Sequence, residues 1–347
     1  MLAKYLKPDQ VTHSIKIAIA CLLGFSIGKI IHFHIDQWLI ITIIVVMCAQ
    51  INVGSMIQKS YMRFLGTLAG SLFAMLVLAI FHDNALAHSA AVTLAVMIFS
   101  YIATTNKNYS DAGTLGAATV AIILIGSNPT IITAIERFLE ISIGILIAAL
   151  VSQFVLPIHA SVYLRKNQAN TLKQLREYYV TIFMNHNPIN IKKIYFELDE
   201  KLATSLINQR KLAIEASRER LGEGFNSGIF KRSLWCEKEI FRSINFMHRA
   251  VHSSTKIEQV LSTQANVTDF HQAICCFMDN IAIAFEKNTA AQENTTLNTN
   301  LLKQSILSSI DTFSLDEKIA VNAFIFCSEM LVERLQELAL NINDHKD

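Results

Sequence analysis

The sequence predicts an all-α integral membrane protein, in which six transmembrane helices over residues 1–157 precede a helical domain over residues 158–347. The first observation is a break in charge. Charged side chains make up 14 of the first 157 residues but 44 of the last 190. A soluble domain carries about a quarter charged residues, so only the second part has a soluble composition. The net charge of +2 excludes a strongly basic nucleic-acid-binding protein.

The second observation is a set of six apolar runs in the first part. A helix needs about 20 apolar residues to cross the hydrocarbon core of a bilayer. The predicted spans are residues 12–31, 38–54, 64–81, 86–103, 112–127 and 137–156. The fifth span is short, because Gly126 and Pro129 end it. Short spans in transporters often line the transport pathway.

The third observation is the distribution of lysine and arginine between the loops. One side of the predicted membrane collects Lys4, Lys7, Lys59, Arg63, Lys107, Arg165 and Lys166, whereas the other has only Lys29 and Arg137. Cytoplasmic loops carry the excess of positive charge. We therefore expect both termini, and the whole of residues 158–347, on the cytoplasmic side. The first apolar run continues to Ile31 without a clear cleavage site, which favours an uncleaved span over a signal peptide.

The second part has helical periodicity and no sustained alternation typical of strands. Helices are expected within residues 158–185, 190–220, 230–256 and 268–287, with a turn at 222–228 and a loop at 288–298. Ser314 and Glu317 form a capping-box pattern that predicts the start of a last helix. Its apolar stripe consists of Val321, Phe324, Leu331, Leu335 and Leu338, and we expect it to contribute to self-association. Trp235 is expected in the core of this bundle.

A recognisable skeleton of residues runs through the predicted spans. Trp38 is followed by Gly54, Lys59, Arg63, Gly66–Thr67 and Gly70, and later by Gly113–Thr114, Arg137, Glu140, Gly144 and Pro157. This skeleton resembles the fusaric acid resistance (FUSC) family, which includes the aromatic acid exporters. The resemblance covers residues 11–157 in sequence and the remainder only in architecture.

The resemblance implies a location and a mode of assembly. Members of the family are similar in being bacterial inner-membrane efflux proteins for aromatic carboxylic acids and related compounds. Plant malate channels resemble the same six-span design and work as dimers. Many bacterial members carry two such halves in one chain, so a chain with one half is expected to form a homodimer or higher homo-oligomer in the bilayer. Some relatives work with a periplasmic adaptor protein, which the resemblance therefore implies as a further partner.

Arg137 and Glu140 are the first candidates for the substrate pathway. They are three residues apart on a predicted helix and therefore share a face. Either they form a structural ion pair, or Arg137 binds the carboxylate of a substrate while Glu140 carries a proton. Arginine suits carboxylate recognition, and a carboxyl group in a low-dielectric site can have a raised pKa.

The remaining candidates lie in or beside the first, third, fifth and sixth predicted spans. Lys16, Lys59 and Arg63 are near the predicted inner boundary, where they serve either as anchors that reach the interface or as a cationic entrance for anions. Thr67 and Thr114 could hydrogen-bond a ligand, or other helices. Gly66, Gly70 and Gly144 are small enough to let helices approach closely.

These features favour a proton-motive-force-driven exporter of small organic anions, including aromatic ones. An anion channel resembling the plant malate channels, and a non-transporting scaffold whose helical bundle binds a partner, are the alternatives. The sequence has no phosphate-binding loop, nucleophile elbow or catalytic carboxylate pair, so we expect no enzyme and no cofactor. The six cysteines have no CxxC spacing, so no metal site is expected.

Overall fold

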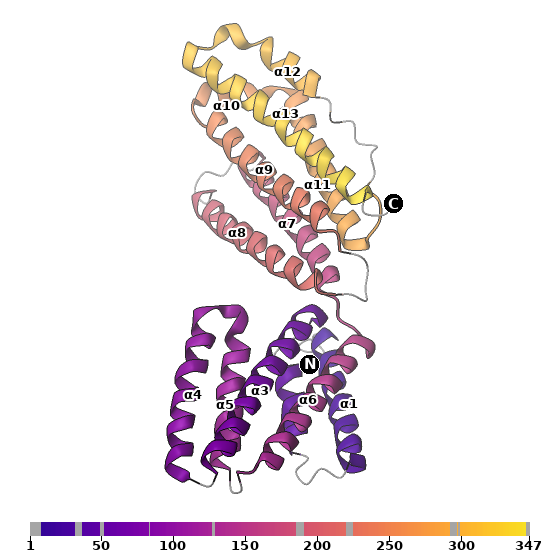
Figure 1. Cartoon of the computed structure of the whole chain (residues 1–347). Coiled ribbons are helices and arrows are strands. Elements are labelled where there is room, and N and C mark those ends of the chain that lie inside the picture. The colour runs from indigo at the N-terminus through magenta and orange to yellow at the C-terminus, as the bar shows by residue number, and fades with distance from the viewer. Residues whose placement is uncertain are drawn as a thin grey trace. The chain divides into compact units, whose positions relative to one another are not determined.

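The computed structural model describes residues 8–31, 37–48, 52–82, 84–126, 129–184, 191–219, 225–291, 297 and 299–344. Within these ranges the only regular secondary structure is helical, as predicted, with thirteen α-helices and two short 3₁₀ turns. Most of the loop expected at 288–298, part of the turn expected at 222–228, and Lys4 and Lys7 lie outside the described residues. The chain forms two compact units (Figure 1). The first comprises Met1–Ala160 and Arg218–Gly222, and the second Ser161–Ser217 and Glu223–Asp347.

The first unit contains one helix for each predicted span. These helices are α1 (Pro8–Ile31), α2 (Gln37–Cys48), α3 (Val53–Phe81), α4 (Ala85–Thr105), α5 (Ser110–Ile125) and α6 (Ile131–Phe154). Three helices of the described chain are long and apolar enough to cross a membrane, namely Asp9–Ile30 within α1, α3 and α4. The apolar helix α2 is shorter. The first unit is therefore a membrane domain with several apolar helices.

The boundary between the second and third predicted spans is wrong. Helix α2 ends at Cys48 rather than at residue 54, and α3 begins at Val53 rather than at residue 64. Asn52 has an extended backbone, and its carbonyl accepts a hydrogen bond from Ser55 Oγ at 3.0 Å, so a new helix starts there. Lys59 and Arg63 therefore belong to α3 and not to a loop between spans.

Helix α3 lies at the centre of the first unit. It packs against α5 on one side and against α6 on another, while α4 packs on α5, and α1 and α2 pack on α6 (Figure 1). Large apolar side chains on the outside of these helices remain exposed, including Leu22, Leu76, Met97 and Leu146. An apolar exterior of this extent is typical of a surface that contacts lipid.

The second unit is a bundle of α7 (Ala160–Phe183), α8 (Ile191–Ala216), α9 (Ser227–Val251), α10 (Thr255–Thr263), α11 (Ala265–Lys287), α12 (Thr299–Leu307) and α13 (Leu315–Asn343). The short helices α10 and α12 were not expected from the sequence. Ser254 caps α10 by accepting a hydrogen bond from the backbone N–H of Lys256 at 3.2 Å. One apolar core is formed from residues of all seven helices.

Helix α13 begins with the predicted capping box, in which Ser314 and Glu317 bond to each other's backbone N–H groups. Its apolar stripe is fully buried in the core of its own unit, from Val321 to Leu338. The expectation that this stripe supports self-association is therefore wrong. Trp235 is not in the core either: it is 45% exposed, and the guanidinium of Arg334 lies 4.5 Å from the centre of its ring.

A buried polar network joins α7, α8 and α9. Gln209 Nε2 donates to Glu237 at 2.6 Å and to the hydroxyl of Thr171 at 2.9 Å. Thr171 in turn contacts Ser205, whose hydroxyl donates to Asn167. Burial raises the pKa of Glu237 to about 8, although the hydrogen bond from Gln209 partly opposes this change. The carboxyl group of Glu237 is therefore mostly protonated at neutral pH.

Candidate functional site

A column of polar side chains runs along one face of α3. Ser60, Arg63, Thr67 and Ser71 are spaced by three, four and four residues, which places them on the same side of a helix. All four are buried, with at most 8% of each residue exposed. Ser60 Oγ, Arg63 Nε, Thr67 Oγ1 and Ser71 Oγ have no hydrogen-bond partner among the residues that the structure describes. We call these four residues the α3 column.

The α3 column is costly for the fold. A buried polar group without a partner costs about 1–3 kcal/mol, and such groups are still less favourable in hydrocarbon. Eleven residues of helix at 1.5 Å each make the column about 16 Å long, about half of the hydrocarbon thickness. Polar and ionisable groups at such positions usually mark ion or substrate pathways. The α3 column is therefore our candidate pathway.

Lys59 and Arg63 lie toward the N-terminal end of α3. Lys59 Nζ forms an ion pair of 3.7 Å with Asp111 of α5, and its side chain is 14% exposed. Asp111 also interacts electrostatically with Arg63. Of the two cations, only Lys59 has a direct carboxylate partner in the described part of the chain. Arg63 is therefore the better candidate to meet an anion.

Glycines bring α3 close to α5. A Cβ atom added to Gly66 would lie 2.2 Å from the carbonyl oxygen of Ala112, and one added to Gly70 would lie 2.6 Å from that of Gly116. Gly144 packs α6 against α2 in the same way, with a distance of 2.9 Å to the carbonyl oxygen of Leu39. The backbones therefore approach more closely than any larger residue allows.

Thr114 is not brought together with the α3 column. It lies on an exposed face of α5, and its hydroxyl donates to the carbonyl of Ser110 at 2.8 Å. This local bond satisfies the hydroxyl within its own helix.

Arg137 and Glu140 form a close pair near the start of α6. Arg137 Nη1 lies 3.0 Å from Glu140 Oε2, and the two side chains are 17% and 4% exposed. The guanidinium also lies 5.3 Å from the centre of the Trp38 ring, at the start of α2. Arg137 therefore has both a carboxylate and an aromatic partner, and the pair is separate from the α3 column along the chain.

Two buried features of the first unit were missed by sequence reasoning. Lys16 is fully buried, and its Nζ donates to the carbonyl of Ser152 at 3.2 Å, so the expectation that it reaches the interface is wrong. Glu219 Oε1 accepts hydrogen bonds from the backbone N–H of Ala160 at 2.7 Å and of Gly54 at 3.3 Å. Neither contact has a signal in the sequence, because the partners are backbone groups far along the chain.

Comparisons with known proteins agree with a membrane protein that has several apolar helices. A family model described as the fusaric acid resistance protein family (FUSC) matches residues 10–188. Inner membrane protein YeeA of Escherichia coli (strain K12) is 25% identical over 234 residues, which are 67% of this chain and 65% of YeeA. Multidrug resistance protein MdtO of the same strain is 26% identical over 178 residues, which are 49% of this chain and 26% of MdtO.

MdtO of Shigella flexneri is 25% identical over 177 residues. The chain thus spans about two thirds of YeeA and about a quarter of MdtO. The family model covers more than half of the chain and confirms the resemblance seen in the sequence. The chain belongs to the fusaric acid resistance protein family, a family of membrane transporters.

Proposed function

We propose that this protein is a secondary exporter of small organic anions, including aromatic ones, in the bacterial inner membrane. In this proposal α1–α6 all cross the bilayer, and both termini and the second unit lie in the cytoplasm. The observation that carries the proposal is the α3 column, with Arg63 buried and its Nε unpartnered in the described structure.

The charge of the column favours an anion. An arginine within a membrane helix costs up to about 2.5–3.5 kcal/mol on insertion scales. A bound carboxylate offsets this cost, since guanidinium and carboxylate groups match in geometry and charge. The hydroxyls of Ser60, Thr67 and Ser71 provide further donors along the same helix face. Lys59 adds positive charge at the end of the column that we assign to the cytoplasm.

Proton coupling is assigned to Glu140. Of the acidic side chains described in α1–α6, Glu140 alone is buried. In the proposed cycle its carboxylate is paired with Arg137, and protonation of Glu140 releases that arginine. A proton entering from the periplasm would then be linked to movement of the anion in the opposite direction.

The anion channel is the second candidate, and the geometry of the same pair favours it. If Arg137 and Glu140 stay paired throughout, held also by Trp38, no described buried acid of α1–α6 remains to carry a proton. Anions would then pass the α3 column only down their own gradient.

Transport by purified protein in proteoliposomes separates the two candidates. Radiolabelled benzoate would be offered under an imposed pH gradient and without one. An exporter accumulates benzoate against its concentration gradient only when the pH gradient is present. A channel equilibrates benzoate but never accumulates it beyond the passive distribution that protein-free vesicles show. Absence of protein-dependent flux, for benzoate and for malate, would overturn both assignments and favour the scaffold.

We further propose that two copies associate in the membrane. The support is the resemblance to the plant malate channels, which share the six-span design and work as dimers. Closed two-fold dimers are the most common oligomers. Mass photometry of the protein in nanodiscs tests this, with a dimer mass expected. A monomer that still transports benzoate would overturn the dimer but not the transport function.

A further inference from the structure

The second unit has an open groove between α8 and α9. Its volume is about 490 Å³, and ligand sites typically have volumes of about 300–1,000 Å³. One face of each helix forms a wall, since the residues of each wall are spaced by three and four along the chain. The residues used below are Arg210 and Ile214 of α8, and Lys231, Leu234, Trp235 and Lys238 of α9. We call this feature the α8–α9 groove.

The charge of the α8–α9 groove has one sign. Arg210, Lys231 and Lys238 line it, and none of its described lining residues is acidic. None of the three cations forms an ion pair with a carboxylate in the part of the chain that the structure describes. Burial lowers the pKa of Lys238, and the positive charges of Arg210 and Arg242 lower it further. Like charges held together in this way favour a ligand that carries negative charge.

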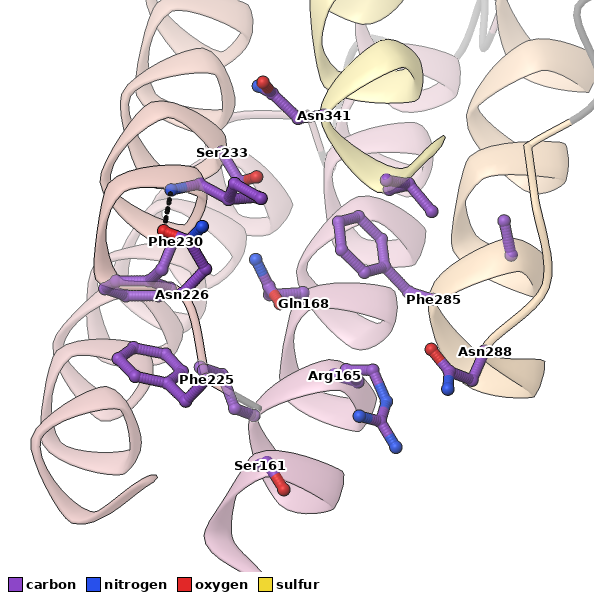
Figure 2. Close-up of a pocket in the computed structure, with 14 residues that line it drawn as sticks. Ser161, Arg165, Gln168, Phe225, Asn226, Phe230, Ser233, Phe285, Asn288 and Asn341 are labelled. Carbon is purple, nitrogen blue, oxygen red and sulfur yellow. Dashed lines mark hydrogen bonds between the residues drawn. The ribbon is translucent and has the colours of Figure 1, made fainter. Parts of the chain in front are cut away.

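The walls between these cations are apolar and partly uncovered. Ile214 is 54% exposed and Trp235 is 45% exposed, although both belong to the unit of soluble composition. Phe225 and Phe230 line both the groove and a smaller cavity of about 60 Å³. Their rings lie next to each other, with centroids 6.0 Å apart (Figure 2). A molecule that fits the groove therefore combines a negative group with an apolar body.

The chain itself ties the groove to the membrane domain. Ser217, a lining residue, is followed at once by Arg218–Gly222, which belong to the first unit. Within that segment Glu219 accepts a hydrogen bond from the backbone N–H of Gly54, in the first turn of α3. The chain then returns to the second unit two residues before Phe225, another lining residue. Consecutive Cα atoms are about 3.8 Å apart, so Ser217 stays beside residues that are held by the start of a membrane helix.

We infer that the α8–α9 groove binds an anionic phospholipid of the cytoplasmic leaflet. Arg210, Lys231 and Lys238 hold the phosphate, and Ile214 and Trp235 contact the glycerol backbone and the acyl chains. Lysine and arginine clusters at the cytoplasmic end of a membrane helix are typical of anionic lipid binding. Tryptophan is favoured where water and hydrocarbon meet. The inference rests on the proposed topology, in which α3 starts at the cytoplasmic side, but not on the transport of an anion.

Fluorescence of Trp235 tests this inference in the groove itself. The chain has two tryptophans, so a Trp38→Phe background leaves Trp235 as the single reporter. The full-length protein in detergent is titrated with phosphatidylglycerol that carries bromine on its acyl chains, since bromine quenches tryptophan at short range. We expect saturable quenching, whereas brominated phosphatidylcholine should need roughly tenfold higher concentrations. Equal quenching by the two lipids, or no saturable quenching, would overturn the inference.

Substitutions with matched charge locate the binding. Arg210→Gln combined with Lys231→Gln should raise the concentration of brominated phosphatidylglycerol for half-quenching by roughly tenfold. The control combines Lys211→Gln with Arg232→Gln, which removes the same two charges from exposed neighbours outside the lining. It should leave the titration unchanged. Equal weakening by both double variants would show that only the overall charge attracts the lipid, and would overturn the groove assignment.

Competition identifies the source of the phosphate. Phosphatidylglycerol without bromine should restore the fluorescence, whereas glycerol 3-phosphate and inorganic phosphate at the same concentrations should not. Restoration by glycerol 3-phosphate as complete as that by the lipid would assign the groove to a soluble phosphate ester. Restoration by polyglutamate at concentrations below those of the lipid would assign it to an acidic protein segment. Either result would overturn the lipid assignment. Detergent solution has neither sides nor flux, so this result is independent of the outcome of the benzoate transport assay.

Discussion

The guanidinium of Arg137 lies 3.0 Å from the carboxylate of Glu140, so each charge neutralises the other within one turn of α6. Arg63 on α3 is more deeply buried than Arg137, and its Nε has no partner in the described structure. The sequence places both arginines in one pathway. In the fold Arg137 already has a carboxylate partner, whereas Arg63 Nε has no hydrogen-bond partner among the described residues. This difference makes separate predictions for each.

Removing one member of the Arg137–Glu140 pair should destabilise the first unit. Breaking a buried ion pair from one side typically costs about 3–5 kcal/mol, so Arg137→Gln and Glu140→Gln should each lower the yield and melting temperature of the purified protein. The double variant should recover much of both, because no unpaired charge remains. Fluorescence-detected size-exclusion chromatography with a thermal ramp measures this. Singles that fold as well as wild type would show that the pair is not structural.

Adding a methyl group at the α3–α5 contact should force the helices apart. Gly66→Ala and Gly70→Ala place a Cβ atom within 2.2 Å and 2.6 Å of carbonyl oxygens of α5, where only backbone movement relieves the clash. Overpacking of this kind costs about 1–3 kcal/mol. Thermal unfolding in detergent should show lower melting temperatures for both. Ala69→Ser, which adds one atom on the exposed face of α3, is the matched control and should change little.

Glu237 should make the stability of the second unit depend on pH. Its pKa is raised from 4.5 to about 8, so its contribution is fully present below pH 4.5 and is lost as the pH rises through about 8. Between pH 4.5 and about 8 the free energy of unfolding of the second unit should fall by up to about 1.4 kcal/mol per pH unit, relative to the Glu237→Gln variant.

Hydrogen exchange of α9 amides in the full-length protein at several pH values, corrected for intrinsic exchange, measures this difference. Glu329→Gln, which removes a half-exposed carboxylate of the same unit, is the control and should follow wild type. A wild type and a Glu237→Gln variant with parallel pH profiles would contradict the assignment.

The topology can be tested with single cysteines in a cysteine-free background. A cysteine at Asn84, between α3 and α4, should react with a membrane-impermeant maleimide from the periplasm. One at Asn108, between α4 and α5, should react only after the membrane is permeabilised. Asn128, the second position that we expect in the periplasm, lies outside the described residues. Labelling of Asn108 from outside would contradict the six-span topology.

The sequence predicted the helices better than the contacts between them. Apolar runs and the Ser314–Glu317 capping box are local patterns, so α1, α4 and α13 lie close to where they were expected. The start of α3 was misplaced because its first turns carry Lys59 and Arg63, which resemble a loop in composition although they continue a helix. The exposure of individual side chains was harder to predict than the helices, as the exposed Trp235 shows. The face of a helix that becomes covered depends on partners that are distant in sequence.

Only two of the four residues of the α3 column were predicted from the sequence. Arg63 and Thr67 were recognised, whereas Ser60 and Ser71 were not, although their spacing of three and four residues is visible in the chain. The missing information was burial: a serine every turn is unremarkable on an exposed face and costly on a buried one. Thr114 shows the converse, because a threonine that is suited to bind a ligand bonds within its own helix.

The most direct test of the central claim is benzoate efflux from proteoliposomes that contain Arg63→Gln. We expect this variant to fold as wild type, because it removes a buried charge from an incompletely partnered position, and to lose at least tenfold in efflux rate. Lys29→Gln, which removes an exposed cation at the end of α1, should retain full efflux. Efflux at the wild-type rate by well-folded Arg63→Gln protein would contradict the assignment of the α3 column as the anion pathway.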